Sequence, residues 1–234
     1  MFVDLTHTFE DGMPGFRMRG PEGEVVQYSA AVSPFLTHAE SEPFYDGKAS
    51  FEIAEVTFQT SIGTYLDAPR HRFPDRHDIA DYSLENLVLP GCVIDVTQCT
   101  PDRSVTLGDL PPGFDPYGKA VLFRFGWDRY WGREEYFDYP FIGRGVLTLL
   151  RDAGAELVGV DTLNIDDSGD PERPAHTWFL DAGIRIVENL CHLDKLPDGD
   201  FRFFAVPLPV RGAAAFPIRA FAEFDNDVFR DFRD

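Results

Sequence analysis

One carboxylate and one histidine lie close enough in the sequence to do chemistry together. Asp67 and His71 are four residues apart in a segment that holds Gly63 and Pro69, so the connection there is bent and rigid. On such an irregular turn the carboxylate and the imidazole can converge on one point. Pairs of this kind bind a metal ion, or form a general base with its orienting carboxylate. The spacing is common by chance and does not separate these two roles.

A second pair lies further along the chain. His176 stands in residues 174–181, which a proline near the start and Gly183 after the end predict to be a short helix, and Glu188 ends the strand that follows. A carboxylate at a strand end is either solvated or part of a site. A third group of acids, in the loop after residues 157–161, is expected to be solvated, although such loops are common site positions in α/β proteins. Its members are Asp161, Asp166, Asp167 and Asp170.

Short apolar runs after turn signals predict the strands that must position these groups. The runs cover residues 51–58, 92–96, 120–123, 157–161, 184–187 and 201–206. Residues 51–58 alternate apolar and polar side chains, which is typical of a half-buried strand. A longer helix is expected over residues 143–153, directly before the strand 157–161. The pattern indicates a mixed α/β fold in one domain over residues 1–234.

The composition excludes several classes of partner. The chain has 40 Asp and Glu against 21 Lys and Arg, a formal net charge of -19 at pH 7. This balance argues against nucleic acid and anionic membranes, whose phosphates need basic side chains. The acidity fits either a salty cytoplasm or an ordinary acidic protein. Cys92, Cys99 and Cys191 form no disulfide framework, and the sequence holds no signal peptide and no membrane-length apolar run, so we expect a cytoplasmic location.

Six segments, taken in order, resemble the cyclase family, which contains the bacterial kynurenine formamidases and related metal-dependent hydrolases. The family hallmark HxGTHxDxPxH is matched by residues 61–71, which read Ser-x-Gly-Thr-Tyr-x-Asp-x-Pro-x-His. The other matches are Asp4-Leu5-Thr6-His7 with Gly12-Met13-Pro14, Phe125-Gly126-Trp127, Val158-Gly159-Val160-Asp161-Thr162, Pro174-Ala175-His176 and Ile186-Val187-Glu188-Asn189-Leu190.

The resemblance implies a mixed, layered β/β/α single domain that assembles as a homodimer or homotetramer, with N-terminal elements reaching towards a neighbour's site. It implies a small-molecule carbonyl substrate and hydrolysis of an amide or lactam, like the arylformamidase step of tryptophan catabolism. In the family the first two motif histidines help to hold a divalent ion, usually zinc or manganese. Here those positions are Ser61 and Tyr65, whose hydroxyl groups are poor neutral ligands.

Three interpretations stay open. In the first, one zinc or manganese ion activates a water for attack on a carbonyl group; its ligands are Asp67, His71, His176 and Glu188. In the second there is no metal: Asp67 orients His71 as a general base, and Tyr65 or the backbone near Gly63 and Thr64 stabilises the oxyanion. In the third, the chain is an inactive relative that binds a small molecule or a partner. Non-hydrolytic cyclisation is also open, because one carbonyl-activating pocket serves both reactions.

Four further side chains are candidates for substrate contacts. They are Ser61, Thr64, Arg72 and Trp127. Arg72 follows His71 and offers a bidentate fork to a substrate carboxylate, although a salt bridge to one of the many acids is the alternative. Trp127 is one of several aromatic residues that could line an apolar pocket. Tyr65 has aromatic packing beside the turn as its alternative role.

Overall fold

The chain forms two compact units in the computed structural model, which describes residues 1–98 and 103–225. The first unit combines Met1–His7 with the chain from Thr64 onwards, and the second is Thr8–Gly63. Cys99 lies outside the described residues. The single domain expected over residues 1–234 stays a prediction.

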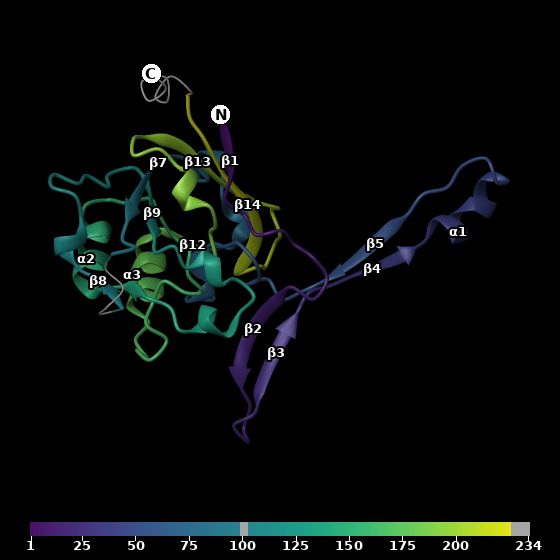
Figure 1. Ribbon diagram of the computed structural model, residues 1–234, viewed down its shortest axis with the longest axis horizontal. Coiled ribbons are helices and arrows are strands. Elements are labelled where there is room, and N and C mark those ends of the chain that lie inside the picture. Colours follow the sequence, from purple (N-terminus) through teal and green to yellow (C-terminus); the bar gives the residue numbers. More distant parts are fainter. Residues whose placement is uncertain (99–102, 226–234) are drawn as a thin grey trace. The chain divides into compact units, whose positions relative to one another are not determined.

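A mixed sheet that closes on itself forms the body of the first unit (Figure 1). Within the described residues its order is β1-β14-β13-β7-β9-β11-β12-β6, and β6 also pairs with β14, so seven strands form a barrel-like ring with β1 on the edge of β14. The strands are β1 (Phe2–Asp4), β6 (Tyr65–Asp67), β7 (Val88–Asp95), β9 (Ala120–Arg124), β11 (Leu157–Val160), β12 (Arg185–Glu188), β13 (Phe201–Pro207) and β14 (Ala215–Glu223).

Strands β7, β9, β11 and β12 run parallel, whereas β13, β14 and β6 pair antiparallel with their neighbours. The carboxyl ends of the four parallel strands therefore meet at one edge of the ring, where α/β proteins usually bind ligands. A separate short pair joins β8 (Ser104–Val105) to β10 (Phe141–Ile142).

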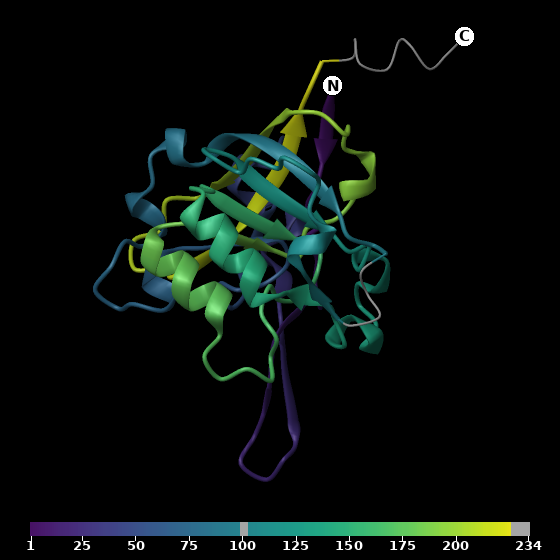
Figure 2. The ribbon, with the colours of Figure 1, turned by 90° about the vertical axis from the view of Figure 1, so that its left-hand side faces the viewer.

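Two helices cover the outer face of the ring. Figure 2 shows α2 (Arg144–Asp152) and α3 (Pro174–Ala182) side by side across the sheet. Because side chains alternate across a strand, Leu122 belongs to the apolar cluster inside the ring while Val121 packs in the cluster beneath the helices. Proline opens α3, and Gly183, at a φ of 79°, ends it. The sequence thus fixes α3 against the sheet and directly before β12.

The mixed α/β fold and most of its elements follow the sequence pattern. Strands β7, β9, β11, β12 and β13 and helices α2 and α3 lie where the apolar runs predicted them. The layered sheet is curved into the closed ring. The pattern did not reveal β1, β6 or β14.

The short 3-10 helices of this unit are η2 (Pro69–His71), η3 (Ile79–Asp81), η4 (Leu84–Asn86), η6 (Leu107–Asp109), η7 (Asp128–Tyr130), η8 (Glu134–Phe137) and η9 (Leu193–Lys195).

The second unit consists of two β-hairpins. They pair β2 (Pro14–Arg19) with β3 (Val25–Ser29), and β4 (Ala31–Leu36) with β5 (Ile53–Thr57); α1 (His38–Ser41) and the 3-10 helix η1 (Glu42–Tyr45) connect β4 to β5. The half-buried strand expected over residues 51–58 is β5, but all of its residues are exposed: Ile53 at 45% and Val56 at 46%. Alternation predicted the strand correctly but not its burial.

Assembly as a homodimer or homotetramer stays a prediction.

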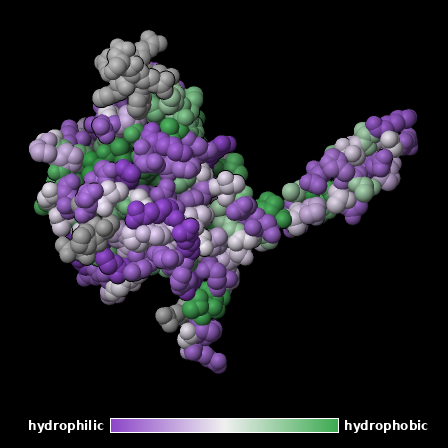
Figure 3. Space-filling model, viewed as in Figure 1, coloured by the Kyte–Doolittle hydropathy of each residue, from purple (hydrophilic) through white to green (hydrophobic). Residues whose placement is uncertain are grey.

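Hydrophilic side chains cover much of the face of the first unit seen in Figure 3, in keeping with the acidic composition. Among the described residues, no helix combines the length and the apolar character that crossing a bilayer requires.

Candidate functional site

Three buried side chains meet at the end of strand β12: Asp67 of β6, His176 of α3 and Glu188 of β12. Tyr65 of β6 lies opposite Glu188 of β12, and Asp67 lies opposite Ile186. Side chains two residues apart share a face, so Tyr65, Asp67 and Glu188 point the same way, towards α3. There His176 Nε2 lies 3.6 Å from Asp67 Oδ2 and 3.6 Å from Glu188 Oε1. The structure therefore brings together three of the four predicted metal ligands, with ligand atoms all within 4.8 Å of one another.

The donor set fits one divalent ion. Two ligands each about 2.1 Å from a tetrahedral ion lie about 3.4 Å apart, close to both separations measured from His176. Both carboxylate oxygens of Asp67 are buried, and neither has a hydrogen-bond partner among the described residues. A buried, unpaired carboxylate is costly unless a cation or a proton compensates it. One imidazole and two carboxylates are donors that zinc and manganese both accept.

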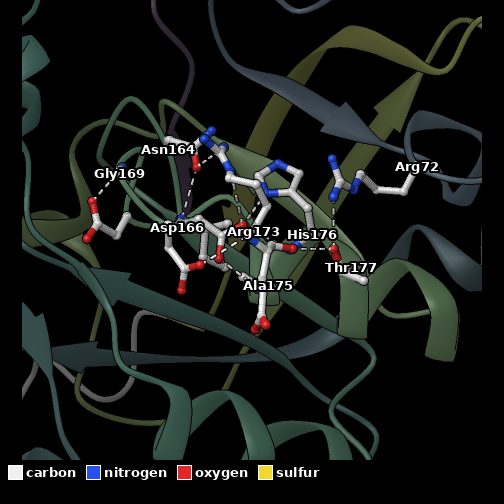
Figure 4. Close-up of polar contacts among 12 residues, drawn as sticks. Arg72, Asn164, Asp166, Gly169, Arg173, Ala175, His176 and Thr177 are labelled. Atoms are coloured by element: carbon white, nitrogen blue, oxygen red, sulfur yellow. Dashed lines mark hydrogen bonds and ion pairs between the residues drawn. The ribbon is translucent and has the colours of Figure 1, made fainter.

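Asp166 holds the histidine of this cluster in place (Figure 4). Its Oδ2 accepts the imidazole Nδ1 of His176 at 2.7 Å and the backbone N–H of His176 at 3.1 Å, while Oδ1 accepts the N–H of Ala175 at 2.6 Å. A carboxylate on Nδ1 fixes the ring orientation and leaves Nε2 free to act as a ligand. Arg173 lies next to Asp166, with its Nε 3.6 Å from Oδ2 of that carboxylate. Its Nη2 donates to Oδ1 of Asn164 at 2.7 Å.

The electrostatics of the cluster favour positive charge. Burial opposes a charge on His176, but the hydrogen bond to Asp166 and the nearby carboxylates of Asp67 and Glu188 outweigh it and raise its pKa to about 10. Burial raises the pKa of Glu188 above its usual range, against the attraction of His176. An ion that binds His176 Nε2 therefore displaces a proton, as metal sites generally do.

Tyr65 is part of this arrangement, but its hydroxyl group is already engaged. The phenol donates a short hydrogen bond to Glu188 Oε2, and the backbone N–H of Ile165 donates to Oε1 at 2.9 Å. Burial raises the pKa of Tyr65, so the phenol keeps its proton. The side chain at this motif position therefore fixes Glu188. Its predicted role as an oxyanion donor stays a prediction.

His71 lies at the exposed side of the cluster. Its Nδ1 is 3.3 Å from Asp67 Oδ1, and its side chain is 35% exposed, whereas that of His176 is 4% exposed. The two imidazole rings lie 5.6 Å apart between centroids. His71 is not one of the three grouped ligands. The two oxygens of Asp67 thus face different histidines, and His71 is the more exposed of the two.

The remaining predicted site residues are distributed as follows. Thr64 is buried, and its hydroxyl donates to the carbonyl of Asn189 at 2.6 Å and accepts the N–H of His7 at 3.1 Å. Trp127 follows β9; its ring packs edge-on against Tyr130 and its Nε1 is buried without a hydrogen-bond partner among the described residues. Ser61 belongs to the second unit. The substrate contacts of these three residues stay predictions.

Arg72 is the fourth predicted contact residue. Its Nη2 donates to the hydroxyl group of Thr177 at 3.0 Å. The salt bridge considered as its alternative role is not found among the described residues.

Comparison with known proteins identifies the family. The Cyclase family model matches residues 3–167. Kynurenine formamidase of Bacillus cytotoxicus is 31% identical over 173 residues, covering 73% of this chain and 79% of that protein. The chain belongs to the cyclase family. Kynurenine formamidase of Salinibacter ruber is a further relative of this cyclase, 30% identical over 177 residues, with 75% of this chain and 81% of that protein covered.

Solved structures share the cyclase fold. An isatin hydrolase bound to the product analogue thioisatinate superposes with a TM-score of 0.82 at 20% identity, covering 96% of this chain and 92% of that one. Isatin hydrolase A from Ralstonia solanacearum gives a TM-score of 0.82 at 23% identity, with the same coverage of 96% and 92%. The resemblance drawn from the ordered motifs and the mixed α/β fold are thereby confirmed.

Two acids of the loop after β11, Asp161 and Asp166, are buried, so the expectation that this group is solvated is wrong for them. Asp161 accepts the N–H groups of Phe125 and Gly126, each at 2.8 Å, and so ties the end of β9 to β11. Burial raises its pKa to about 7 against these two bonds. Asp166 is the orienting carboxylate of His176. The sequence offered one signal for them, their place after a parallel strand. That signal is weak because solvated acids are common in such loops.

Replacing Asp166 with Asn should weaken divalent-ion binding by roughly 10- to 100-fold, the usual loss when the orienting partner of a histidine ligand is changed. The amide keeps one acceptor oxygen. Turned towards His176, that oxygen accepts without a negative charge, and the amide NH2 group then faces the N–H of Ala175, so the ring is held less firmly. Competition with a chromophoric chelator measures the affinity. Asp167→Asn is the matched control: among the described residues the Asp167 side chain accepts a hydrogen bond only from the N–H of Gly169, in its own loop, so this variant should bind the ion like the wild type. Equal affinity for both variants would exclude the orienting role.

Proposed function

We propose that this cyclase is a cytoplasmic hydrolase of the carbon–nitrogen bond in a small amide or lactam, with one divalent ion held by Asp67, His176 and Glu188. The buried cluster carries the proposal, since neither Asp67 oxygen has a hydrogen-bond partner in the part of the chain that the structure describes. The relatives named kynurenine formamidase and the fold shared with isatin hydrolases support the type of bond.

The chemistry divides between the cluster and His71. A divalent ion, when bound, polarises a carbonyl group and lowers the pKa of a nearby water. His71 directs Nδ1 towards Asp67, at 3.3 Å, which leaves Nε2 to take a proton from the attacking water. Asp67 keeps the imidazole oriented and stabilises its charge. As the carbon–nitrogen bond breaks, His71 gives the proton to the leaving nitrogen, and the products are a carboxylic acid and an amine.

Tyr65 and Ile165 keep Glu188 in its working position. The phenol holds Oε2 and the backbone N–H holds Oε1, which still faces His176 at 3.6 Å. The carboxylate therefore cannot rotate freely in its buried site, and the geometry of the cluster exists before an ion or a substrate arrives. Such pre-organisation is the main way in which a protein scaffold lowers a reaction barrier.

Metal removal and return tests the function. The purified protein is assayed for bound metals by mass spectrometry, stripped with a chelator, and reconstituted with Zn²⁺ or Mn²⁺. Hydrolysis of N-formylkynurenine, aryl formamides, lactams and aryl esters is measured at each stage. We expect one ion per chain and activity that is lost on stripping and returns on reconstitution.

The other interpretations make different predictions for the same experiment. Full activity without an ion would favour the metal-free enzyme, in which Asp67 and His71 act alone. An ion bound without hydrolysis of any compound would favour an inactive binding relative. Conversion of an open substrate to a ring would identify a non-hydrolytic cyclase.

A further inference from the structure

Arg72 lies next to the cluster and has no carboxylate partner among the described residues. Its guanidinium is exposed and donates one hydrogen bond, at 3.0 Å, to the neutral hydroxyl of Thr177. That hydroxyl in turn donates to the carbonyl of Glu172 at 2.8 Å. A guanidinium has five N–H donors, so most of those on Arg72 have no partner among the described residues.

Nine other described arginines of the first unit are paired with carboxylates at 2.5–3.1 Å. The pairs are Arg76–Asp181, Arg103–Asp138, Arg124–Asp95, Arg144–Asp170, Arg151–Asp152, Arg185–Glu156, Arg202–Glu223, Arg211–Asp81 and Arg219–Asp4. With 40 acidic residues in the chain, a carboxylate partner is easily found. Among the described residues Arg72 shares the absence of one with Arg70, Arg129 and Arg133, and it differs from them in its contact with Thr177, the neighbour of His176. Its fork is therefore open to an anion from outside at the cluster itself.

The contact of Arg72 with Thr177 lies next to the contact between His71 and His176. His71 and Arg72 are neighbours at the end of η2, and His176 and Thr177 are neighbours on α3. Both contacts therefore bridge the same two elements, one residue apart. Figure 4 shows the Arg72 side chain extending to Thr177 beside His176.

Exposure shows the side from which the cluster can be reached. The side chain of Asp67 is fully buried, whereas that of His71 is 35% exposed. Solvent therefore approaches Asp67 past His71, and Arg72 is the next residue along. A net charge of -19 repels anionic molecules at long range, so a carboxylate-bearing substrate needs a local cation at this entrance.

We propose that Arg72, steadied by Thr177, binds a carboxylate on the substrate, so that the preferred substrates are amides or lactams that also carry one carboxylate. This inference rests on the proposed hydrolase function and names its substrate class. Arginine suits the role because its planar fork matches a carboxylate bidentately. The scissile carbonyl then faces the cluster while the carboxylate stays at the entrance.

Matched substrate pairs test the proposal. Formanilide and its 2-, 3- and 4-carboxylate derivatives differ only in the carboxylate, and kcat/KM is measured for each with the ion-loaded wild type and with Arg72→Gln and Arg72→Lys. We expect the ratio of carboxylate to neutral substrate to fall roughly 10- to 50-fold in Arg72→Gln, mainly through KM, with partial recovery in Arg72→Lys. The ratio in the wild type should also fall as salt is added.

Arg70→Gln is the control, because Arg70 lies two residues earlier, is exposed and donates to the backbone carbonyl of Pro74 at 2.6 Å. It should leave the ratio unchanged. The inference is wrong if Arg72→Gln lowers both kcat/KM values equally, or if Arg70→Gln shifts the ratio as much. If the wild type hydrolyses none of the compounds, the proposed function fails. Calorimetric titration with the same compounds then decides the inference: equal affinity of wild type and Arg72→Gln for the carboxylates would overturn it.

Discussion

Replacing Asp67 with Asn is expected to lower kcat/KM for an aryl formamide by roughly a thousandfold or more, without lowering the free energy of unfolding. Asp67 serves both halves of the site: Oδ2 faces His176 at 3.6 Å and Oδ1 faces His71 at 3.3 Å. An amide of the same size offers a weaker ligand to an ion and a poorer partner to an imidazole.

Stability should not fall with activity, because the cost of burying the Asp67 charge beside Glu188 offsets its attraction to His71 and His176. Neither oxygen has a hydrogen-bond partner among the described residues, and Glu188, a second carboxylate, lies in the same cluster. Removing such a charge from the ion-free protein is expected to leave the unfolding free energy unchanged or raise it by about 1 kcal/mol. Urea unfolding of the stripped protein measures this.

Asp78→Asn is the control for this prediction. Asp78 is also buried, but it accepts the N–H of Gly212 at 2.7 Å and of Ala80 at 2.9 Å, and it pairs with Arg211. Its replacement should destabilise the protein and spare kcat/KM of the folded fraction. An Asp67→Asn variant that unfolds more easily than the wild type while remaining active would mean that Asp67 is structural.

Replacing His71 with Ala is expected to lower kcat by roughly 10²- to 10⁴-fold while the ion stays bound. A general base contributes about this much, and His71 is outside the group of three ligands. Because its side chain is partly exposed, truncation should cost little stability. Added imidazole should restore part of the rate, since a small base can enter the vacated space from solvent.

The control is His77→Ala, an exposed histidine six residues further along, which should keep full activity. Metal analysis of each variant separates loss of the base from loss of the ion. If His71→Ala keeps its rate within about threefold of the wild type, the proton must be taken elsewhere; if it loses the ion, His71 is a ligand.

Much of the cluster could be predicted because its members fall on the ordered motifs of the cyclase family, whereas the spacing of Asp67 and His71 alone is common by chance. Asp67 and His71 share one short segment, and His176 and Glu188 stand at the boundaries of a helix and a strand that apolar runs reveal. The structure confirms that these elements form as expected. It places Asp67, His176 and Glu188 together and His71 beside them.

The missed features depend on partners distant in sequence. Strand β6 has three residues within a segment that reads as a turn, and it becomes a strand only through pairing with β12 and β14. Asp166 reads as one more solvated acid until the N-terminus of α3 is packed against it. For β5, an alternating pattern specifies the strand but not whether another surface covers it.

The double pairing of β6 has a consequence for how activity and folding are linked. Tyr65 and Glu188 are 123 positions apart in sequence, and β6 is the strand that closes the ring between β12 and β14. The cluster therefore exists only once the ring is closed, and any opening at this seam separates Asp67 from Glu188. Any activity measured for this chain would therefore report that β6 is paired with β12 and β14, since a form open at this seam cannot hold the three ligands together.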